Sequence, residues 1–248
     1  MGVIVLVIYK LYYKLLQKMK EIRIFRHIYA RLFGNYGRTW DLYALSKNSA
    51  IKAILTSAEN EEMFDRKGKE DAEKLMKFIE PDSIVLDLGC GIGRIEKFLA
   101  PFCKEIHGVD VSGRMIKLAK KRVKEGNVFF HKTNGRDLSI FSDNKFDFVF
   151  SLLVLQHLAK EDAFYYLLEI HRVLKPGGKA YLQFPNILHE DNLREFIDYA
   201  KKYRVRSVAK MRYYTKDEVE KFLEAAGFEI LSMEVDRDIF VLVRKLRG

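Results

Sequence analysis

Three glycines at alternate positions follow a short apolar run and form the most distinctive pattern in this chain. The segment reads Val-Leu-Asp-Leu-Gly-Cys-Gly-Ile-Gly over residues 85–93. Glycine accepts positive φ angles and has no Cβ atom, so such a turn lets a ligand approach the main chain closely. A helix beginning near Arg94 would point its first amides at the same place. The pattern predicts a dinucleotide, phosphate or other adenosine site, or else a plain tight turn.

Two carboxylates narrow the choice of ligand. Asp110 ends a second apolar run about twenty residues after the first glycines, where a nucleoside-binding unit places its ribose acceptor. Asp87 directly precedes the glycine turn, where it would repel a pyrophosphate but suit a cationic amino-acid group. The glycine spacing is also GxGxG and not the GxGxxG of dinucleotide sites. These residues favour S-adenosylmethionine over NAD.

On these residues the chain resembles the class I S-adenosylmethionine-dependent methyltransferases. The first motif of that family is an acid followed by GxGxG, and its second is an acid that closes the next strand. Further segments match in the expected order from about Asp71 to the C-terminus, including a Pro-Gly-Gly turn at 176–178. The resemblance implies an α/β fold with a Rossmann-like, seven-stranded, mostly parallel sheet flanked by helices and an antiparallel last strand. We expect residues 1–70 to form a helical N-terminal extension or cap and residues 71–248 to form the methyltransferase domain.

The resemblance also assigns cofactor-binding roles. It implies that Asp87 lies near the methionine end of the cofactor, Asp110 on the ribose and Asp137 at the adenine. The other expected cofactor contacts are Gly89, Cys90, Gly91, Gly93, Val111, Met115, Arg136, Ser151 and Leu152. The expected cofactor is S-adenosylmethionine, the expected product is S-adenosylhomocysteine, and no metal is expected.

His157 is the candidate catalytic residue, because it falls in the loop after the expected fourth strand, beside the methyl-transfer site of this family. Methyl transfer from a sulfonium is an in-line displacement, so positioning supplies much of the acceleration. A base is needed only if the acceptor loses a proton, and the ordinary pKa of histidine suits that step near neutrality. The alternatives are a structural histidine, or an acceptor oriented by Gln156.

The first forty residues carry eight basic side chains and one acid. Helical spacing places six apolar residues on one face: Ile4, Ile8, Leu11, Leu15, Met19 and Ile22. Lys10 and Lys14 interrupt the apolar run well short of the ~20 residues that span a bilayer, and no signal-peptide pattern is present. We expect this amphipathic helix to pack on the enzyme or a second subunit, or to lie on an anionic membrane surface.

A cap is expected between this helix and the core. Related methyltransferases carry an early tryptophan and a Phe-x-x-x-Gly pattern there, which Trp40 and the pair Phe64 and Gly68 resemble. These aromatic residues are expected to form a lid that excludes water, or to anchor the extension to the core.

The amino-acid composition limits the kinds of binding partner that we expect. The chain has only two cysteines, which predicts neither disulfides nor a metal cluster and fits a cytoplasmic protein, peripheral at the membrane if its first helix binds lipid. The net charge of +10 belongs to the N-terminus and to a basic segment, 201–212, so the remaining chain is slightly acidic. That segment suits a phosphate, a carboxylate or an anionic saccharide, or it is a solvated face.

These observations favour a methyltransferase acting on oxygen, nitrogen or carbon of a small, lipid-linked or saccharide-linked acceptor. The Asn/Asp-Pro-Pro-Tyr signature of base methylation is absent at 151–154, where Ser-Leu-Leu-Val stands, so nucleic acid is less expected. The alternatives are an RNA methyltransferase that holds phosphates with its basic segments, and a noncatalytic subunit that binds S-adenosylmethionine. A dehydrogenase is a further alternative, which the absence of NAD binding would exclude.

Overall fold

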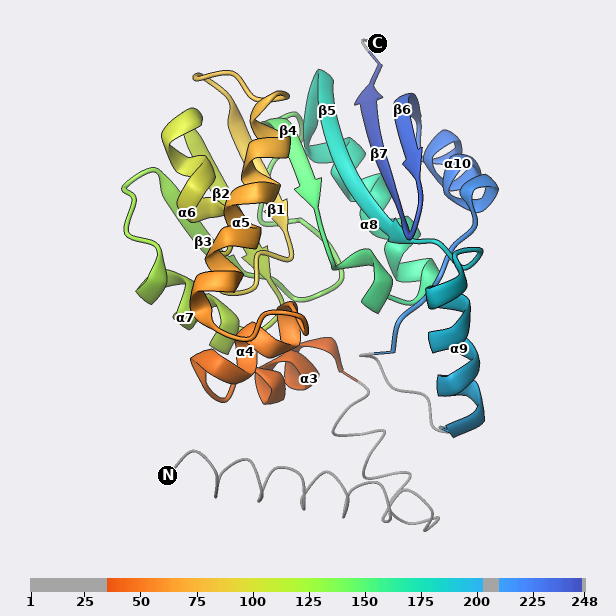
Figure 1. Cartoon of the computed structure of the whole chain (residues 1–248). Helices are drawn as coiled ribbons and strands as arrows, with labels where there is room; N and C mark the ends of the chain where they lie inside the picture. Colours follow the sequence, from red (N-terminus) through yellow and green to blue (C-terminus); the bar gives the residue numbers. More distant parts are fainter. Residues whose placement is uncertain (1–34, 203–209, 247–248) are drawn as a thin grey trace.

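The computed structural model describes residues 35–202 and 210–246 (Figure 1). The predicted N-terminal amphipathic helix therefore lies outside the described residues, as do Arg204 and Arg206 of the basic segment. The helices are α3 (Tyr36–Tyr43), α4 (Lys47–Ile54), α5 (Glu61–Met76), α6 (Glu96–Leu99), α7 (Gly113–Arg122), α8 (Lys160–Val173), α9 (Glu190–Lys202) and α10 (Lys216–Ala225). The strands are β1 (Ile84–Leu88), β2 (Glu105–Asp110), β3 (Val128–Lys132), β4 (Phe146–Ser151), β5 (Leu174–Pro185), β6 (Phe228–Val235) and β7 (Asp238–Lys245). Two short 3-10 helices are η1 (Ala100–Phe102) and η2 (Leu155–His157).

The seven strands form one sheet in the order β3-β2-β1-β4-β5-β7-β6. All pairings from β3 to β5 are parallel, whereas β7 runs antiparallel to both β5 and β6. The predicted Rossmann-like fold, with a mostly parallel sheet and an antiparallel last strand, is confirmed.

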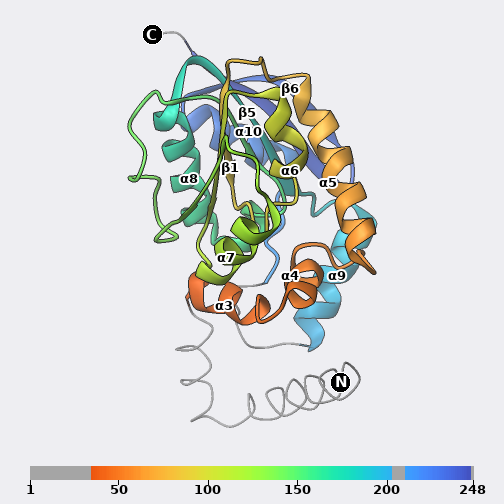
Figure 2. The same cartoon turned by 90° about the vertical axis from the view of Figure 1, so that its left-hand side faces the viewer.

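Helices cover both faces of the sheet, and Figure 2 shows α5 and α8 on opposite sides of it. Side chains of α8 and α10 pack with the strands into the larger apolar cluster, while α5 and α6 form a second cluster on the other face. Strands buried on both faces read as continuous apolar runs and not as an alternating pattern. Five of the six residues of β4, which reads Phe-Asp-Phe-Val-Phe-Ser, are buried, and Asp147 is the half-buried exception. No helix within 35–202 and 210–246 is long and apolar enough to cross a membrane.

The cap helices α3, α4 and α5 each begin at a residue whose side chain accepts a backbone N–H of the first turn. These residues are Asn35, Ser46 and Asn60, and such caps satisfy amides that have no partner within the helix. The predicted boundary between the cap and the methyltransferase domain, at residue 70, falls inside α5. One helix thus runs from the cap onto the sheet.

Gly68 brings α5 against the segment that follows the glycine turn. A Cβ atom at Gly68 would collide with the carbonyl oxygen of Arg94. The Arg94 guanidinium also donates to the Asp71 carboxylate at 2.6 Å, one turn further along α5. The fully buried Phe64 packs one turn earlier, in a cluster that joins the cap to Ile92 and Met115. The Phe-x-x-x-Gly pattern therefore lies on the face of α5 that contacts the core.

Replacing Gly68 by alanine tests this close approach. Alanine ordinarily stabilises a helix interior by about 1 kcal/mol relative to glycine, but here its Cβ meets a backbone oxygen. We expect Gly68→Ala to lower the melting temperature. Gly126→Ala is the control, because no atom lies within 4 Å of a Cβ there. A Gly68→Ala protein at least as stable as the wild type would contradict the close packing.

Candidate functional site

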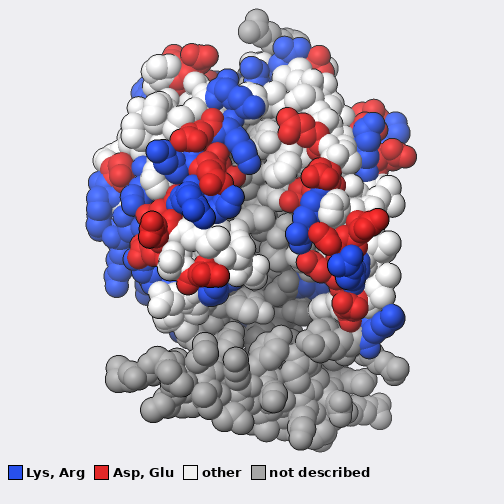
Figure 3. All heavy atoms as spheres, in the orientation of Figure 1, with Lys and Arg blue, Asp and Glu red and all other residues white. Residues whose placement is uncertain are grey.

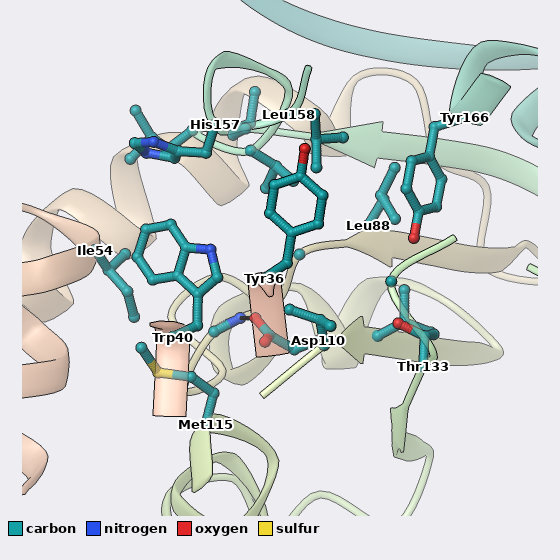
Figure 4. Close-up of a pocket in the computed structure, with 18 of the residues that line it drawn as sticks. Tyr36, Trp40, Ile54, Leu88, Asp110, Met115, Thr133, His157, Leu158 and Tyr166 are labelled. Atoms are coloured by element: carbon teal, nitrogen blue, oxygen red, sulfur yellow. Dashed lines mark hydrogen bonds between the residues drawn. The ribbon is translucent and has the colours of Figure 1, made fainter. Parts of the chain in front are cut away.

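A pocket opens at the carboxyl ends of β1, β2, β3 and β4 (Figure 4). The chain moves outward from β1 to β3 and then returns to β4 on the other side of β1, and sheets of this kind bind ligands where the strand order reverses. The cavity encloses about 770 Å³, its open mouth included. It is lined by Tyr36, Trp40, Ala53, Ile54, Leu88, Gly89, Gly91, Val109, Asp110, Val111, Met115, Thr133, Gly135, Leu152, Leu153, Val154, His157, Leu158 and Tyr166.

The glycine turn forms the floor of the pocket beyond β1. Gly89, Gly91 and Gly93 all have positive φ angles, which side chains other than glycine rarely adopt. A Cβ on Gly89 would collide with Val154, and one on Gly91 would lie 2.6 Å from Ile54 Cδ1. Gly93 faces away from the pocket, and a Cβ there would collide with Val123, which directly follows α7. Only the first two glycines line the pocket.

Asp110 joins the turn to the second strand. Its Oδ2 accepts the Gly91 N–H at 3.1 Å, and its Oδ1 accepts the Ser112 N–H at 2.7 Å. The carboxylate faces the pocket, but the surrounding protein buries it and raises its pKa to about 6. Near neutral pH it is therefore an anionic acceptor that can take hydrogen bonds from two ligand hydroxyls.

Asp87 lies beneath the turn and does not line the pocket. Its carboxyl is buried beside that of Glu96, and burial together with the neighbouring charge raises the pKa of Asp87 well above its usual value. Neither Glu96 oxygen accepts a well-formed hydrogen bond from the described residues, and the nearby Arg94 is paired with Asp71. Two buried carboxyls in one site hold a proton between them, because both cannot ionise cheaply.

His157 and Trp40 meet on the opposite wall. Their ring centroids lie 4.9 Å apart with the rings edge to face, and Figure 4 shows the indole between His157 and Met115. The amide nitrogen of Gln156 lies 3.2 Å from His157 Nε2. Arg212 fixes this loop by donating from its guanidinium to the His157 carbonyl oxygen at 2.8 Å and from its backbone N–H to the Gln156 carbonyl oxygen at 2.7 Å.

The structure brings part of the predicted site together. Seven predicted residues line the pocket: Gly89, Gly91, Asp110, Val111, Met115, Leu152 and His157. Six do not: Asp87, Cys90, Gly93, Arg136, Asp137 and Ser151. Ser151 donates from its hydroxyl to the Leu88 carbonyl oxygen and so ties β4 to β1. Asp137 accepts from Ser139 and from the Asn134 amide, which turns its carboxylate toward its own loop.

Other lining residues were not identified from the sequence. Thr133 directly follows β3, so the convergence of parallel strand ends could have indicated it. Tyr36 lies at the start of α3 and Tyr166 in the middle of α8, and no local pattern marks either of them. Figure 4 shows the Tyr166 hydroxyl on the Thr133 side of the pocket, away from Trp40 and His157.

These residues fit an adenosine ligand. Asp110 can accept ribose hydroxyls, and Val111 and Met115 offer apolar surface for a base. The hydroxyls of Thr133 and Tyr166 add polar groups at one end. Within the described ranges, no group of three or more His, Cys, Asp or Glu side chains could hold a metal ion.

Comparisons with known proteins agree with this geometry. Residues 86–182 match a family model described as a methyltransferase domain. Demethylmenaquinone methyltransferase of Tropheryma whipplei is 30% identical over 183 residues, which cover 66% of this chain and 74% of that protein. Phosphoethanolamine N-methyltransferase 2 of Caenorhabditis elegans is 30% identical over 154 residues, 60% of this chain, but the match spans only 33% of that enzyme.

Solved structures show the same fold. Magnesium protoporphyrin IX methyltransferase from Synechocystis PCC 6803, with bound S-adenosylhomocysteine, superposes with a TM-score of 0.64. The alignment covers 84% of this chain and 98% of that one at 19% sequence identity. At this identity the likeness concerns the fold.

The protonation of Asp110 is expected to control cofactor affinity. The ionised carboxylate accepts ribose hydroxyls, so affinity for S-adenosylhomocysteine should fall as the pH drops below about 6. Asp110→Asn should weaken binding about 10- to 100-fold at pH 8 and remove this pH dependence. Calorimetric titration from about pH 5 to pH 8 measures both effects. Asp82→Asn, on an exposed side chain just before β1 and outside the pocket lining, is the control and should bind as the wild type. An Asp110→Asn protein with wild-type affinity would refute the assignment.

The buried pair of Asp87 and Glu96 is expected to make stability depend on pH. An acid whose pKa is higher in the folded than in the unfolded protein favours folding at low pH and loses that contribution as the pH rises. Between about pH 5 and pH 8, the melting temperature of the wild type should therefore fall more steeply than that of Glu96→Gln. Glu59→Gln, at an exposed position, should follow the wild type. Parallel curves for all three proteins would rule out the shared proton.

Proposed function

The chain belongs to the class I S-adenosylmethionine-dependent methyltransferases, and on that premise we propose that it methylates a small, largely apolar acceptor in the pocket described above. The observation that carries the proposal is the lining itself. Apart from the residues assigned to the cofactor, the lining is mainly aliphatic and aromatic, with Trp40, Ile54 and Leu158 as examples, and none of the described lining residues is lysine or arginine. An acceptor with a phosphate or another anionic group would meet no lysine or arginine of the described lining, and burying an unpaired charge is costly.

Two basic residues of the 201–212 segment that the structure describes, Lys210 and Arg212, do not line the pocket. The Arg212 guanidinium donates to the carbonyl oxygens of His157 and Lys210. The Lys210 ammonium lies over the rings of Phe196 and Tyr199, 5.6 and 5.1 Å from their centroids. One relative is named for demethylmenaquinone, which is a quinone, and this name supports an apolar acceptor. The name of the other relative, for phosphoethanolamine, gives less support to an apolar acceptor.

An RNA acceptor is the second candidate from the sequence, and the charges on the described part of one face do not favour it. Acidic and basic side chains are interspersed over the described part of the face in Figure 3. RNA recognition calls for basic surface gathered where the phosphates run. An RNA product therefore remains an outcome of the experiment below.

In this proposal S-adenosylmethionine supplies an electrophilic methyl group on a sulfonium, and the chain supplies binding and orientation. Asp110 would hold the ribose, and the amino-acid part of the cofactor would lie along the pocket lining at Gly89 and Gly91. Ile54 and Val154 border the same turn and exclude water from it. Positioning of this kind provides much of the acceleration of a displacement reaction.

His157 would receive the proton of an acceptor hydroxyl or amine. With the Gln156 amide donating to Nε2, the ring carries its own proton on Nδ1, so that Nε2 is the basic atom. The Trp40 edge and the Arg212 bond to the His157 carbonyl oxygen limit the orientations open to the ring. An acceptor that displaces the amide can then be deprotonated at Nε2.

Methyl transfer from labelled S-adenosylmethionine tests the function. The purified chain is offered three acceptor pools in parallel: phenols and quinols, phosphoethanolamine, and total RNA. We expect label in the first pool alone. Transfer to phosphoethanolamine or RNA would overturn the proposed acceptor class. Binding of S-adenosylmethionine without transfer to any pool would favour the noncatalytic subunit.

Substitution of His157 tests its role as a base. With an acceptor that loses a proton, His157→Asn should lower kcat about a hundredfold and leave the affinity for S-adenosylhomocysteine nearly unchanged. His189→Asn is the matched control, because His189 lies outside the pocket lining. An unchanged kcat for His157→Asn would remove the residue from the mechanism.

A further inference from the structure

Helix α3 supplies hydrogen-bonding groups to the N-termini of two core helices. The carboxylate of Asp41 accepts from the Ser112 hydroxyl at 2.6 Å and from the Arg114 N–H at 3.0 Å. Ser112 is itself the N-cap of α7, and the Arg114 guanidinium donates back to the Asp41 carbonyl oxygen at 3.3 Å. Asp41 thus adds a negative group at a helix N-terminus, where amides without helical partners and the helix dipole favour one.

Tyr36 does the same for α8. The N-cap of α8 is Ala159, whose side chain cannot accept a hydrogen bond. The Tyr36 hydroxyl accepts the Ala159 N–H at 2.8 Å and donates to Asp162 Oδ2 at 2.8 Å. Burial raises the pKa of Tyr36 to about 12, so the hydroxyl keeps the proton that it donates. A residue 123 positions earlier in the chain therefore satisfies the backbone N–H of the N-cap residue of α8.

The two helices begin next to opposite walls of the pocket. Helix α7 starts at Gly113, three residues after Asp110, and α8 starts at Lys160, three residues after His157. Because α3 bonds to both N-termini, it spans the pocket from one wall to the other. Figure 4 shows side chains of α3, Tyr36 and Trp40, beside Asp110 and between these walls.

We propose that Tyr36 and Asp41 are positioning residues that clasp α3 across the pocket, so that cofactor enters and product leaves only when these two caps open. The inference rests on the proposed function, because it takes the pocket to hold S-adenosylmethionine. It assigns the closure of the site to two hydrogen-bonding side chains and not to the apolar packing of the cap.

The clasp also couples cofactor exchange to the order of the site. Opening α3 leaves the Ala159 and Arg114 amides without these acceptors, directly beside the loops that carry His157 and Asp110. Closing it restores both caps and brings Trp40 against the His157 ring. The residues that bind the cofactor and the candidate base thus reach their final positions together.

The fluorescence of Trp40 can report on the clasp, by which we mean the hydrogen bonds of Tyr36 and Asp41 to the starts of α8 and α7. Trp40 is the only tryptophan in the chain and it lines the pocket, so its fluorescence reports binding without a label. We would measure association and dissociation of S-adenosylhomocysteine by stopped flow for the wild type, Tyr36→Phe and Asp41→Leu. Tyr36→Phe loses the hydroxyl, and Asp41→Leu loses both carboxylate oxygens at a similar side-chain size.

We expect both rate constants to rise about tenfold in each variant, because a looser clasp opens more often for entry and for exit. Loss of an ordinary binding contact would raise the dissociation rate alone. The controls are Tyr165→Phe, on an exposed side chain of α8, and Asp198→Leu, on an exposed side chain of α9; both should behave as the wild type. Unchanged rates, or a change confined to dissociation, would overturn the clasp.

Hydrogen exchange in the wild type gives a second test that needs no variant. The Ala159 and Arg114 amides should be protected, and S-adenosylhomocysteine should slow their exchange by a common factor. Free exchange at either amide in the complex would contradict the proposal. If calorimetry shows that the wild type binds neither S-adenosylmethionine nor S-adenosylhomocysteine, the proposed function itself fails. Normal binding with unchanged kinetics defeats the clasp alone.

Discussion

The Asp110 carboxylate is the interaction on which the rest of the site depends. One oxygen holds the glycine turn after β1 through Gly91, and the other holds the start of α7 through Ser112. The turn is also tied to β2 by the N–H groups of Gly89 and Cys90, which donate to the Val109 carbonyl oxygen. The Asp110 carboxylate therefore connects the ends of two neighbouring strands, the glycine turn and the N-terminus of α7. Its remaining acceptor capacity faces the pocket, where a nucleoside would find it.

The cap completes this arrangement from outside the sheet. Gly68 and Phe64 fasten α5 to the segment after the glycine turn and to the core, while Ile54 of α4 lies against Gly91. Asp41 of α3 bonds to Ser112, the residue that also donates to Asp110. The cap is thus connected to the cofactor anchor through one serine. Closure of the pocket and the geometry of its central carboxylate are parts of one hydrogen-bond network.

Much of the fold and part of the site could be predicted from the sequence. Apolar runs closed by acids or glycines predicted the strands, and the antiparallel last strand is confirmed. Parallel strands end at one edge, which is why Asp110, Leu152 and His157 meet although they are far apart in sequence. Asp137 faces its own loop because the nearby Ser139 and Asn134 side chains donate hydrogen bonds to its carboxylate. Motif spacing does not reveal such local hydrogen bonds. Tyr36 could not be identified, because its bond to Ala159 depends on how the cap docks.

A crystal structure of the chain with S-adenosylhomocysteine tests the central claim most directly, since that claim concerns where a nucleoside lies. The account predicts both ribose hydroxyls on the Asp110 carboxylate, the amino-acid part of the ligand over Gly89 and Gly91, and Trp40 closing the pocket beside it. A ligand bound elsewhere, or bound in this pocket with its ribose away from Asp110, would contradict the account.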